Sequence, residues 1–204
     1  MPSPNTLPNA ERHESFQSII ENALTKYGWI TSDLCYHNHV PLPVKRLLAR
    51  IDDRTSMTIR TRSDRFSAHP DYGVFKWEVK TAKKYGNDFL FEAWPFLIHS
   101  LEHRFGVKCS YFWDSCGDRK VAAHVNEMWP LIETYFYTAR ATEEERQLAR
   151  KYFPGVSQQY CESFGSGDAF FKIPLFKSSK LEDWSLFIER ISAKSSNAQP
   201  AVIA

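Results

Sequence analysis

The segment that decides the fold is residues 64–81, which read DRFSAHPDYGVFKWEVKT. In its second half, Phe75, Trp77 and Val79 alternate with charged residues, a pattern typical of a β-strand with one apolar face. The turn-forming composition of residues 69–73 predicts a reversal of the chain just before this strand. The segment therefore predicts a β-hairpin.

The charged face of the predicted strand carries candidate catalytic groups. Glu78 and Lys80 are two residues apart, so alternation places their carboxylate and ammonium groups on the same side. With an opposing carboxylate, Glu78 would complete a site for Mg²⁺, which prefers one or two carboxylates, several waters and a phosphate oxygen. Such an ion activates water and neutralises charge on a phosphodiester, while Lys80 would orient the water. The alternative is that both residues form the solvated face of an amphipathic strand.

Two aspartates compete for the opposing position. Asp71 follows Pro70 and gives a literal P-D before E-x-K, yet it falls at the predicted tip of the hairpin. Asp64 and Glu78 each lie seven residues from residue 71, so they would face each other across the ladder. We therefore favour Asp64 over Asp71.

Further elements follow on both sides of the hairpin. The patterns predict helices over residues 16–27, 88–104, 126–152 and 181–191, and strands over 57–62, 107–113 and 169–176. Gly28 is the expected stop of the first helix, and Pro95 must kink the second or lie in its first turn. This order predicts an α/β domain with a central mixed sheet flanked by helices.

The arrangement of Asp64, Glu78 and Lys80, with a helix before it and a helix and strand after it, resembles the PD-(D/E)xK nuclease superfamily. The resemblance covers roughly residues 12–125. It implies a restriction-endonuclease-like αβββαβ core and Mg²⁺-dependent hydrolysis of nucleic acid, with DNA favoured over RNA and Mn²⁺ as a substitute ion. Asp64 and Glu78 would bind the metal. The resemblance also implies a homodimer, as in many members of the superfamily.

The same superfamily often contributes a glutamate from its first helix. The candidates are Glu14 and Glu21, which share one helix edge with Gln17. Gln17 lies nearest the position expected for this residue, but it is not a glutamate. Of the two glutamates, we assign the role to Glu21.

A basic stretch leads into the predicted site. It contains Lys45, Arg46, Arg50, Arg54, Arg60, Arg62 and Arg65. Phosphate contacts from such residues would supply affinity that is independent of sequence. We expect Arg60 and Arg62, together with Lys83 and Lys84 just past the motif, to bind nucleic acid.

Two other functions remain as alternatives. The first is a catalytically silent member of the same fold that binds only nucleic acid or a protein. The second is a zinc peptidase, because residues 99–103 match the H-x-x-E-H pattern, with Glu182 or Glu189 as a possible third ligand. Against the peptidase, the apolar stripe of that helix suggests that His99 and His103 face outward.

Composition bounds the remaining possibilities. The net charge of +2 excludes a histone-like basic coat, and no run approaches the roughly 18 apolar residues of a membrane span. The first residues lack the pattern of a signal peptide, and the four cysteines include no C-x-x-C pair, so we expect an intracellular protein. One domain over residues 11–193 is expected, between flexible segments 1–10 and 194–204.

Overall fold

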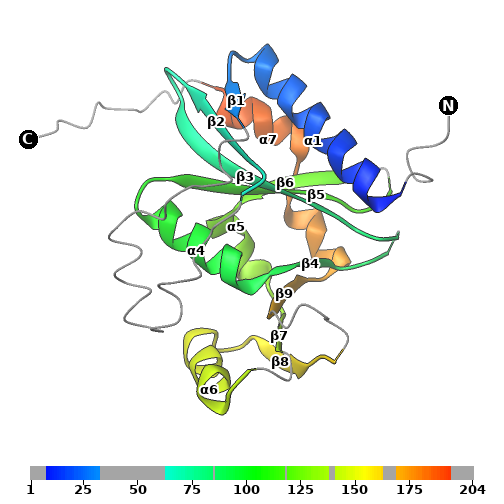
Figure 1. Cartoon of the computed structure of the whole chain (residues 1–204), viewed down its shortest axis with the longest axis vertical. Helices are drawn as coiled ribbons and strands as arrows, with labels where there is room; N and C mark the ends of the chain where they lie inside the picture. The colour runs from blue at the N-terminus through cyan, green and yellow to red at the C-terminus, as the bar shows by residue number, and fades with distance from the viewer. Residues whose placement is uncertain are drawn as a thin grey trace, which may run out of the picture.

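A computed structural model describes residues 8–32, 63–84, 86–117, 119–137, 141–162 and 169–193. These residues form two β-sheets covered by helices (Figure 1). The larger sheet, sheet A, has the strand order β1-β2-β3-β5-β6-β10. Its strands are β1 (Ile30–Ser32), β2 (Arg65–His69), β3 (Gly73–Thr81), β5 (Lys108–Asp114), β6 (Lys120–His124) and β10 (Glu182–Asp183). The β3–β5 pair is parallel and the other pairs of sheet A are antiparallel, so the sheet is mixed.

Helices cover both faces of sheet A (Figure 1). On one face, α1 (Asn9–Lys26) and α7 (Trp184–Ile191) pack on an apolar cluster to which β3 contributes Phe75, Trp77 and Val79. On the other face lie α4 (Ala93–Arg104) and the short α5 (Val125–Met128). The predicted fold class, an α/β domain with a central mixed sheet flanked by helices, is confirmed.

The order of elements around sheet A follows the expected αβββαβ pattern, from α1 through β1, β2 and β3 to α4 and β5. The parallel β3–β5 pair requires a crossover, and α4 supplies it. One strand, β4 (Phe89–Glu92), is inserted before α4 and belongs to a second sheet.

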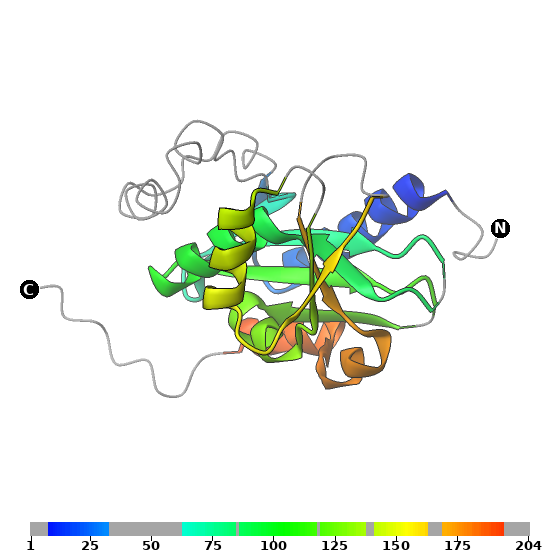
Figure 2. The ribbon, with the colours of Figure 1, turned by 90° about the horizontal axis from the view of Figure 1, so that it is seen from below.

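This second sheet, sheet B, has the order β4-β9-β7-β8. It adds β9 (Phe170–Ile173), β7 (Thr134–Tyr137) and β8 (Ser157–Tyr160), with α6 (Glu143–Tyr152) between β7 and β8. The 3₁₀ helices η3 (Trp129–Leu131) and η4 (Leu175–Lys180) complete the described elements. Seen from below, the strands of sheet B cross in front of sheet A, with α6 to one side of them (Figure 2). No helix in the described ranges is long and apolar enough to cross a membrane.

Three predicted helices are shorter than expected. The last of them, expected over 181–191, begins at Trp184, because Glu182–Asp183 pair with β6 as β10. Within the helix expected over 88–104, residues Phe89–Glu92 instead form the strand β4. Buried Phe89 and Phe91 alternate there with exposed Leu90. Pro95 then falls in the first turn of α4, one of its two expected positions. The expected helix over 126–152 is interrupted by β7, whose Thr-Tyr-Phe-Tyr sequence is rich in strand-favouring residues.

The predicted hairpin is confirmed as β2 and β3. Their register runs from His69 opposite Gly73 to Arg65 opposite Trp77. Gly73 has φ +82°, a left-handed conformation that glycine adopts without strain. However, Lys76 and Glu78 are buried rather than solvated, because α4 covers the charged face of β3.

Candidate active site

The two carboxylates favoured by the sequence lie side by side. Because Arg65 is opposite Trp77, the next position of the β2–β3 ladder brings Asp64 opposite Glu78. The Asp64 backbone N–H donates to Glu78 Oε2 at 3.2 Å. In return, the Val79 backbone N–H donates to Asp64 Oδ2 at 2.6 Å. Each carboxylate is thus held by the backbone of the opposite strand.

Lys80 completes the cluster from the same face of β3. Its Nζ lies 2.8 Å from Glu78 Oε1 and 2.6 Å from Glu92 Oε2. Glu92 is the last residue of β4 and immediately precedes α4, so the junction of the two sheets places it here. The ammonium group therefore bridges two carboxylates from different sheets.

Burial sets the charge states of this cluster. Burial raises the pKa of Glu78 to about 7, although the positive charge of Lys80 opposes that rise. Burial alone would lower the pKa of Lys80, but Glu78 and Glu92 outweigh it, so the pKa is raised and Lys80 stays protonated. Near neutral pH, Glu78 can therefore gain or lose a proton beside a permanent positive charge.

A histidine from α1 approaches the site from the other side. His13 Nε2 lies 3.4 Å from Asp64 Oδ2 and 3.1 Å from the Val79 carbonyl oxygen. The hydrogen bond with Asp64 raises the pKa of His13, although burial opposes this. Burial would raise the pKa of Asp64, but the hydrogen bonds from His13 and the Val79 N–H lower it overall. Asp64 is consequently an ionised carboxylate with a fixed orientation.

The candidate glutamates of the first helix lie elsewhere. Glu21 Oε1 pairs with Arg65 Nε at 2.5 Å, and Arg65 Nη1 donates to the Asp64 carbonyl oxygen. Among the residues that the structure describes, Glu21 is therefore linked to the site through Arg65. Glu14 is exposed to solvent and Gln17 is buried.

The remaining candidates divide by position. Asp71 is exposed at the hairpin tip, where its N–H donates to His69 Nδ1, at the far end of β3 from Glu78. Lys83 and Lys84 are exposed just after β3 ends. Arg60 and Arg62 lie outside the described residues, as do the predicted strand at 57–62 and the rest of the basic stretch before Arg65.

The residues of the H-x-x-E-H pattern are engaged in other contacts. His99 is buried, not outward-facing as expected, and its Nδ1 lies 3.0 Å from the Tyr111 hydroxyl. Burial lowers the pKa of His99 to about 3, so its imidazole is neutral. Glu102 Oε1 pairs with Lys76 Nζ at 2.7 Å. The expectation that His99 faces outward is wrong, because α4 turns the side that carries His99 and Glu102 towards the charged face of β3.

The donor set at Asp64 and Glu78 suits one class of metal. Across the described ranges, no group of three or more His, Cys, Asp or Glu side chains is arranged to hold a metal ion. Two adjacent carboxylates are nevertheless enough for Mg²⁺, which takes oxygen ligands and keeps several of its waters. The chemistry of the pair thus fits Mg²⁺ or Mn²⁺ better than Zn²⁺, which needs a fuller protein shell.

Comparisons with known proteins include a distant likeness to a solved structure. No protein family and no curated protein sequence matches this chain. Among solved structures, Hjc from Archaeoglobus fulgidus, a Holliday junction resolvase from an archaeal hyperthermophile, matches with a TM-score of 0.44 and 12% sequence identity. The match covers 86% of this chain and 98% of that chain. A likeness this distant assigns no family to the chain.

Proposed function

We propose that the protein is a metal-dependent nuclease of the PD-(D/E)xK type that hydrolyses phosphodiester bonds in DNA. The observation that carries the proposal is the pairing of Asp64 with Glu78 across the β2–β3 ladder, with the Lys80 ammonium 2.8 Å from Glu78. A solvated strand face does not require opposed carboxylates that are buried beside a lysine. The cost of burying these charges is consistent with a functional site.

Each residue of the cluster has a distinct role in this proposal. Asp64 and Glu78 would hold Mg²⁺ or Mn²⁺, which when bound neutralises phosphate charge and acidifies a water molecule. Lys80 would orient the attacking water and stabilise charge on the phosphate oxygens. Glu92 keeps the Lys80 ammonium beside Glu78, and His13 fixes the orientation of Asp64.

Conservative variants test the proposal best, because Glu78 and Lys80 are largely buried and alanine would leave voids and unpaired groups. DNA cleavage would be measured after EDTA treatment and again after Mg²⁺ or Mn²⁺ is added. We expect Glu78→Gln and Lys80→Met to lower the cleavage rate by about 10²-fold or more. Unchanged cleavage in both variants, with folding checked by circular dichroism, would contradict the assignment.

A second candidate, a silent member that binds nucleic acid without cutting it, also has an observation in its favour. Glu78 Oε1 already contacts Lys80, Glu78 Oε2 accepts from Asp64, and Asp64 Oδ2 accepts from Val79. A metal must therefore share or displace these contacts. Calorimetric titration with Mn²⁺ separates the two candidates: binding that is lost in Glu78→Gln supports the nuclease, and DNA binding without metal uptake supports the silent protein.

A further inference from the structure

Strand β8 lies at the edge of sheet B in the part of the chain that the structure describes. It runs parallel to β7, and the backbone N–H groups of Ser157 and Cys161 donate to carbonyl oxygens on the β7 side. Backbone direction alternates along a strand, so the N–H and C=O groups of Gln158 and Tyr160 point away from β7. These outward groups can accept another strand.

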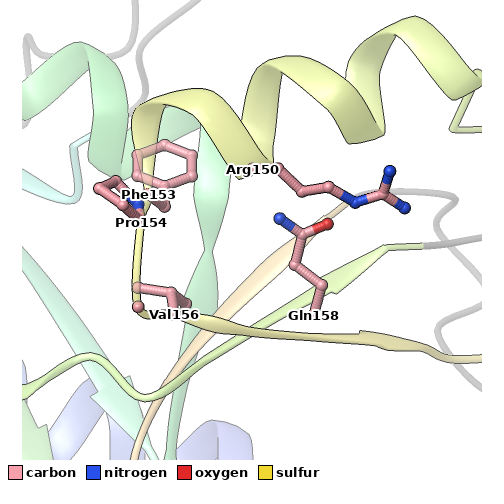
Figure 3. A pocket seen from close by; sticks show the side chains of 6 residues that line it. Arg150, Phe153, Pro154, Val156 and Gln158 are labelled. Atoms are coloured by element: carbon pink, nitrogen blue, oxygen red, sulfur yellow. The ribbon is translucent and has the colours of Figure 1, made fainter.

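Helix α6 lies close to β8, and a hollow lies between the two elements. Figure 1 places α6 and β8 together at one end of the molecule. In Figure 3, Arg150 of α6 and Gln158 of β8 extend into the same space, a hollow of about 290 Å³ bounded by Phe153, Pro154 and Val156. Gln158 Oε1 is buried and accepts no hydrogen bond from the described residues. A buried acceptor without a donor is destabilising, so a partner that brings a donor would be favoured here.

The charges of α6 indicate which partner fits. Its first turn carries Glu143, Glu144 and Glu145, and its last turn carries Arg150 and Lys151. Glu143 and Arg150 lie on the same side of the helix, since Arg150 Nη1 is 3.3 Å from Glu143 Oε1. An antiparallel copy of α6 would place Glu143 next to Arg150 of the second copy, and Arg150 next to its Glu143. The three carboxylates of the first turn would repel the phosphates of a nucleic acid, so a nucleic acid is not the favoured partner here.

The geometry of a two-fold pair agrees with this charge pattern. An axis perpendicular to sheet B at the β8 edge makes the two β8 strands antiparallel and keeps both α6 helices on the same face. The Arg146 guanidinium of α6 lies 5.4 Å from the centre of the Tyr137 ring of β7, so α6 covers sheet B close to the β7–β8 pair. Paired strands are about 4.8 Å apart, so two helices in this position would come within about 10 Å, the usual helix-packing distance. Such a contact is self-complementary, as a two-fold interface must be.

We propose that a second copy of this chain docks on the β8 edge, joining two copies of sheet B into one continuous sheet with antiparallel α6 helices beside each other. Gln158 would then gain its missing donor from the second copy, and the Glu143–Arg150 contacts would form twice. This interface is independent of the nuclease proposal, because it involves none of the residues of the Asp64 cluster.

The first test removes the edge hydrogen bonds. Gln158→Pro deletes an N–H that points away from β7, so the internal ladder of sheet B is retained. Sedimentation equilibrium of the full chain should show a dimer for the unaltered protein and a monomer for Gln158→Pro. A monomeric unaltered protein at the highest soluble concentration, or a dimer that survives Gln158→Pro, would overturn the proposal.

The second test exchanges charges between copies. Glu143→Arg and Arg150→Glu each place like charges together in a homodimer, and each should weaken dimerisation by at least about tenfold. An equal mixture of the two variants should restore a dimer, because the mixed pair regains both attractive contacts. Lys26→Glu, an exposed reversal at the end of α1, is the matched control and should change nothing. Failure of the mixture to associate would overturn the interface. So would a monomeric unaltered protein in which Arg150→Glu instead lowers DNA binding, because the surface would then belong to nucleic acid.

Discussion

Asp64 and Glu78 hold each other through the backbone of the opposite strand. The Asp64 N–H donates to Glu78 Oε2 at 3.2 Å, and the Val79 N–H donates to Asp64 Oδ2 at 2.6 Å. A shift of the β2–β3 register by one residue would break both bonds, since side chains would change faces. The hairpin therefore sets the spacing of the two carboxylates.

The first prediction compares the two aspartates that the sequence offered. Asp64→Asn should weaken Mn²⁺ binding by about tenfold or more and lower cleavage with it, because one charged oxygen ligand is lost. Asp71→Asn should leave both unchanged, because Asp71 lies at the far tip of the hairpin. Calorimetric titration of each variant gives the comparison, and the reverse result would move the site to the literal P-D sequence.

The second prediction concerns stability against pH in the absence of metal. The pKa of Glu78 is raised from 4.5 to about 7 by burial, so between these values the folded state keeps a proton that the unfolded state releases. Stability should therefore fall as pH rises through this window, by up to about 3 kcal/mol, and then level off.

Urea unfolding at several pH values measures this slope, and Glu78→Gln is the matched variant because it cannot ionise. The difference between the two proteins should grow from pH about 5 to about 7. An equal slope in both proteins would show that Glu78 does not titrate in this range.

The third prediction concerns His13. Its hydrogen bond contributes to the lowered pKa of Asp64, so His13→Ala should raise that pKa. Carbon-13 NMR titration of the aspartate side chains would detect the shift. His103→Ala serves as the control, because His103 contacts the Cys109 N–H instead, and an unchanged Asp64 titration in His13→Ala would remove His13 from the site.

The fourth prediction concerns the ion pair between Lys76 and Glu102, which lies under α4 with side chains 7% and 0% exposed. Glu102→Gln leaves a buried ammonium without its counter-charge and should cost about 3–5 kcal/mol of unfolding free energy. Replacing both residues, in Lys76→Met/Glu102→Leu, should recover most of the loss. Glu182→Gln, which affects a more exposed pair with Arg190, should cost less than about 1 kcal/mol in the same denaturant titration.

The sequence was sufficient for the hairpin because local signals determined it. Alternation fixed the faces of β3, the turn composition fixed residues 69–73, and equal distances from the turn placed Asp64 opposite Glu78. These signals depend on residues close in the chain. Such residues are therefore the part of the candidate site that could be predicted.

The rest of the site depends on packing between distant elements. Glu92 is not among the expected site residues because it falls inside the helix expected over 88–104, although the alternation from Phe89 to Phe91 is a signal for a strand. His13 lies on the same edge of α1 as Gln17 and Glu21, but the acidic pattern of that edge does not single out a histidine. The charged face of β3 is buried where Glu102 of α4 reaches Lys76, and no local pattern reveals that position of α4.

The last prediction concerns capture of nucleic acid. A net charge of +2 is too small for strong global attraction, so we expect any nucleic-acid binding to depend on a local group of cations. Lys83 and Lys84 are exposed where β3 ends, just past Lys80, and each should contact a phosphate.

Replacing either Lys83 or Lys84 by alanine should weaken binding about equally for all nucleic-acid sequences. It should also reduce the slope of log affinity against log salt by about one. Binding would be measured across salt concentrations in a Glu78→Gln background, in which we expect cleavage to be much slower. Lys108→Ala is the matched control, because Lys108 is also exposed but lies at the other end of the sheet from Lys83 and Lys84. It begins β5, whereas Asp114 at the end of β5 pairs with Thr81 at the end of β3. Equal slopes for all three variants and the parent would mean that these lysines are solvated and that the nucleic acid binds elsewhere.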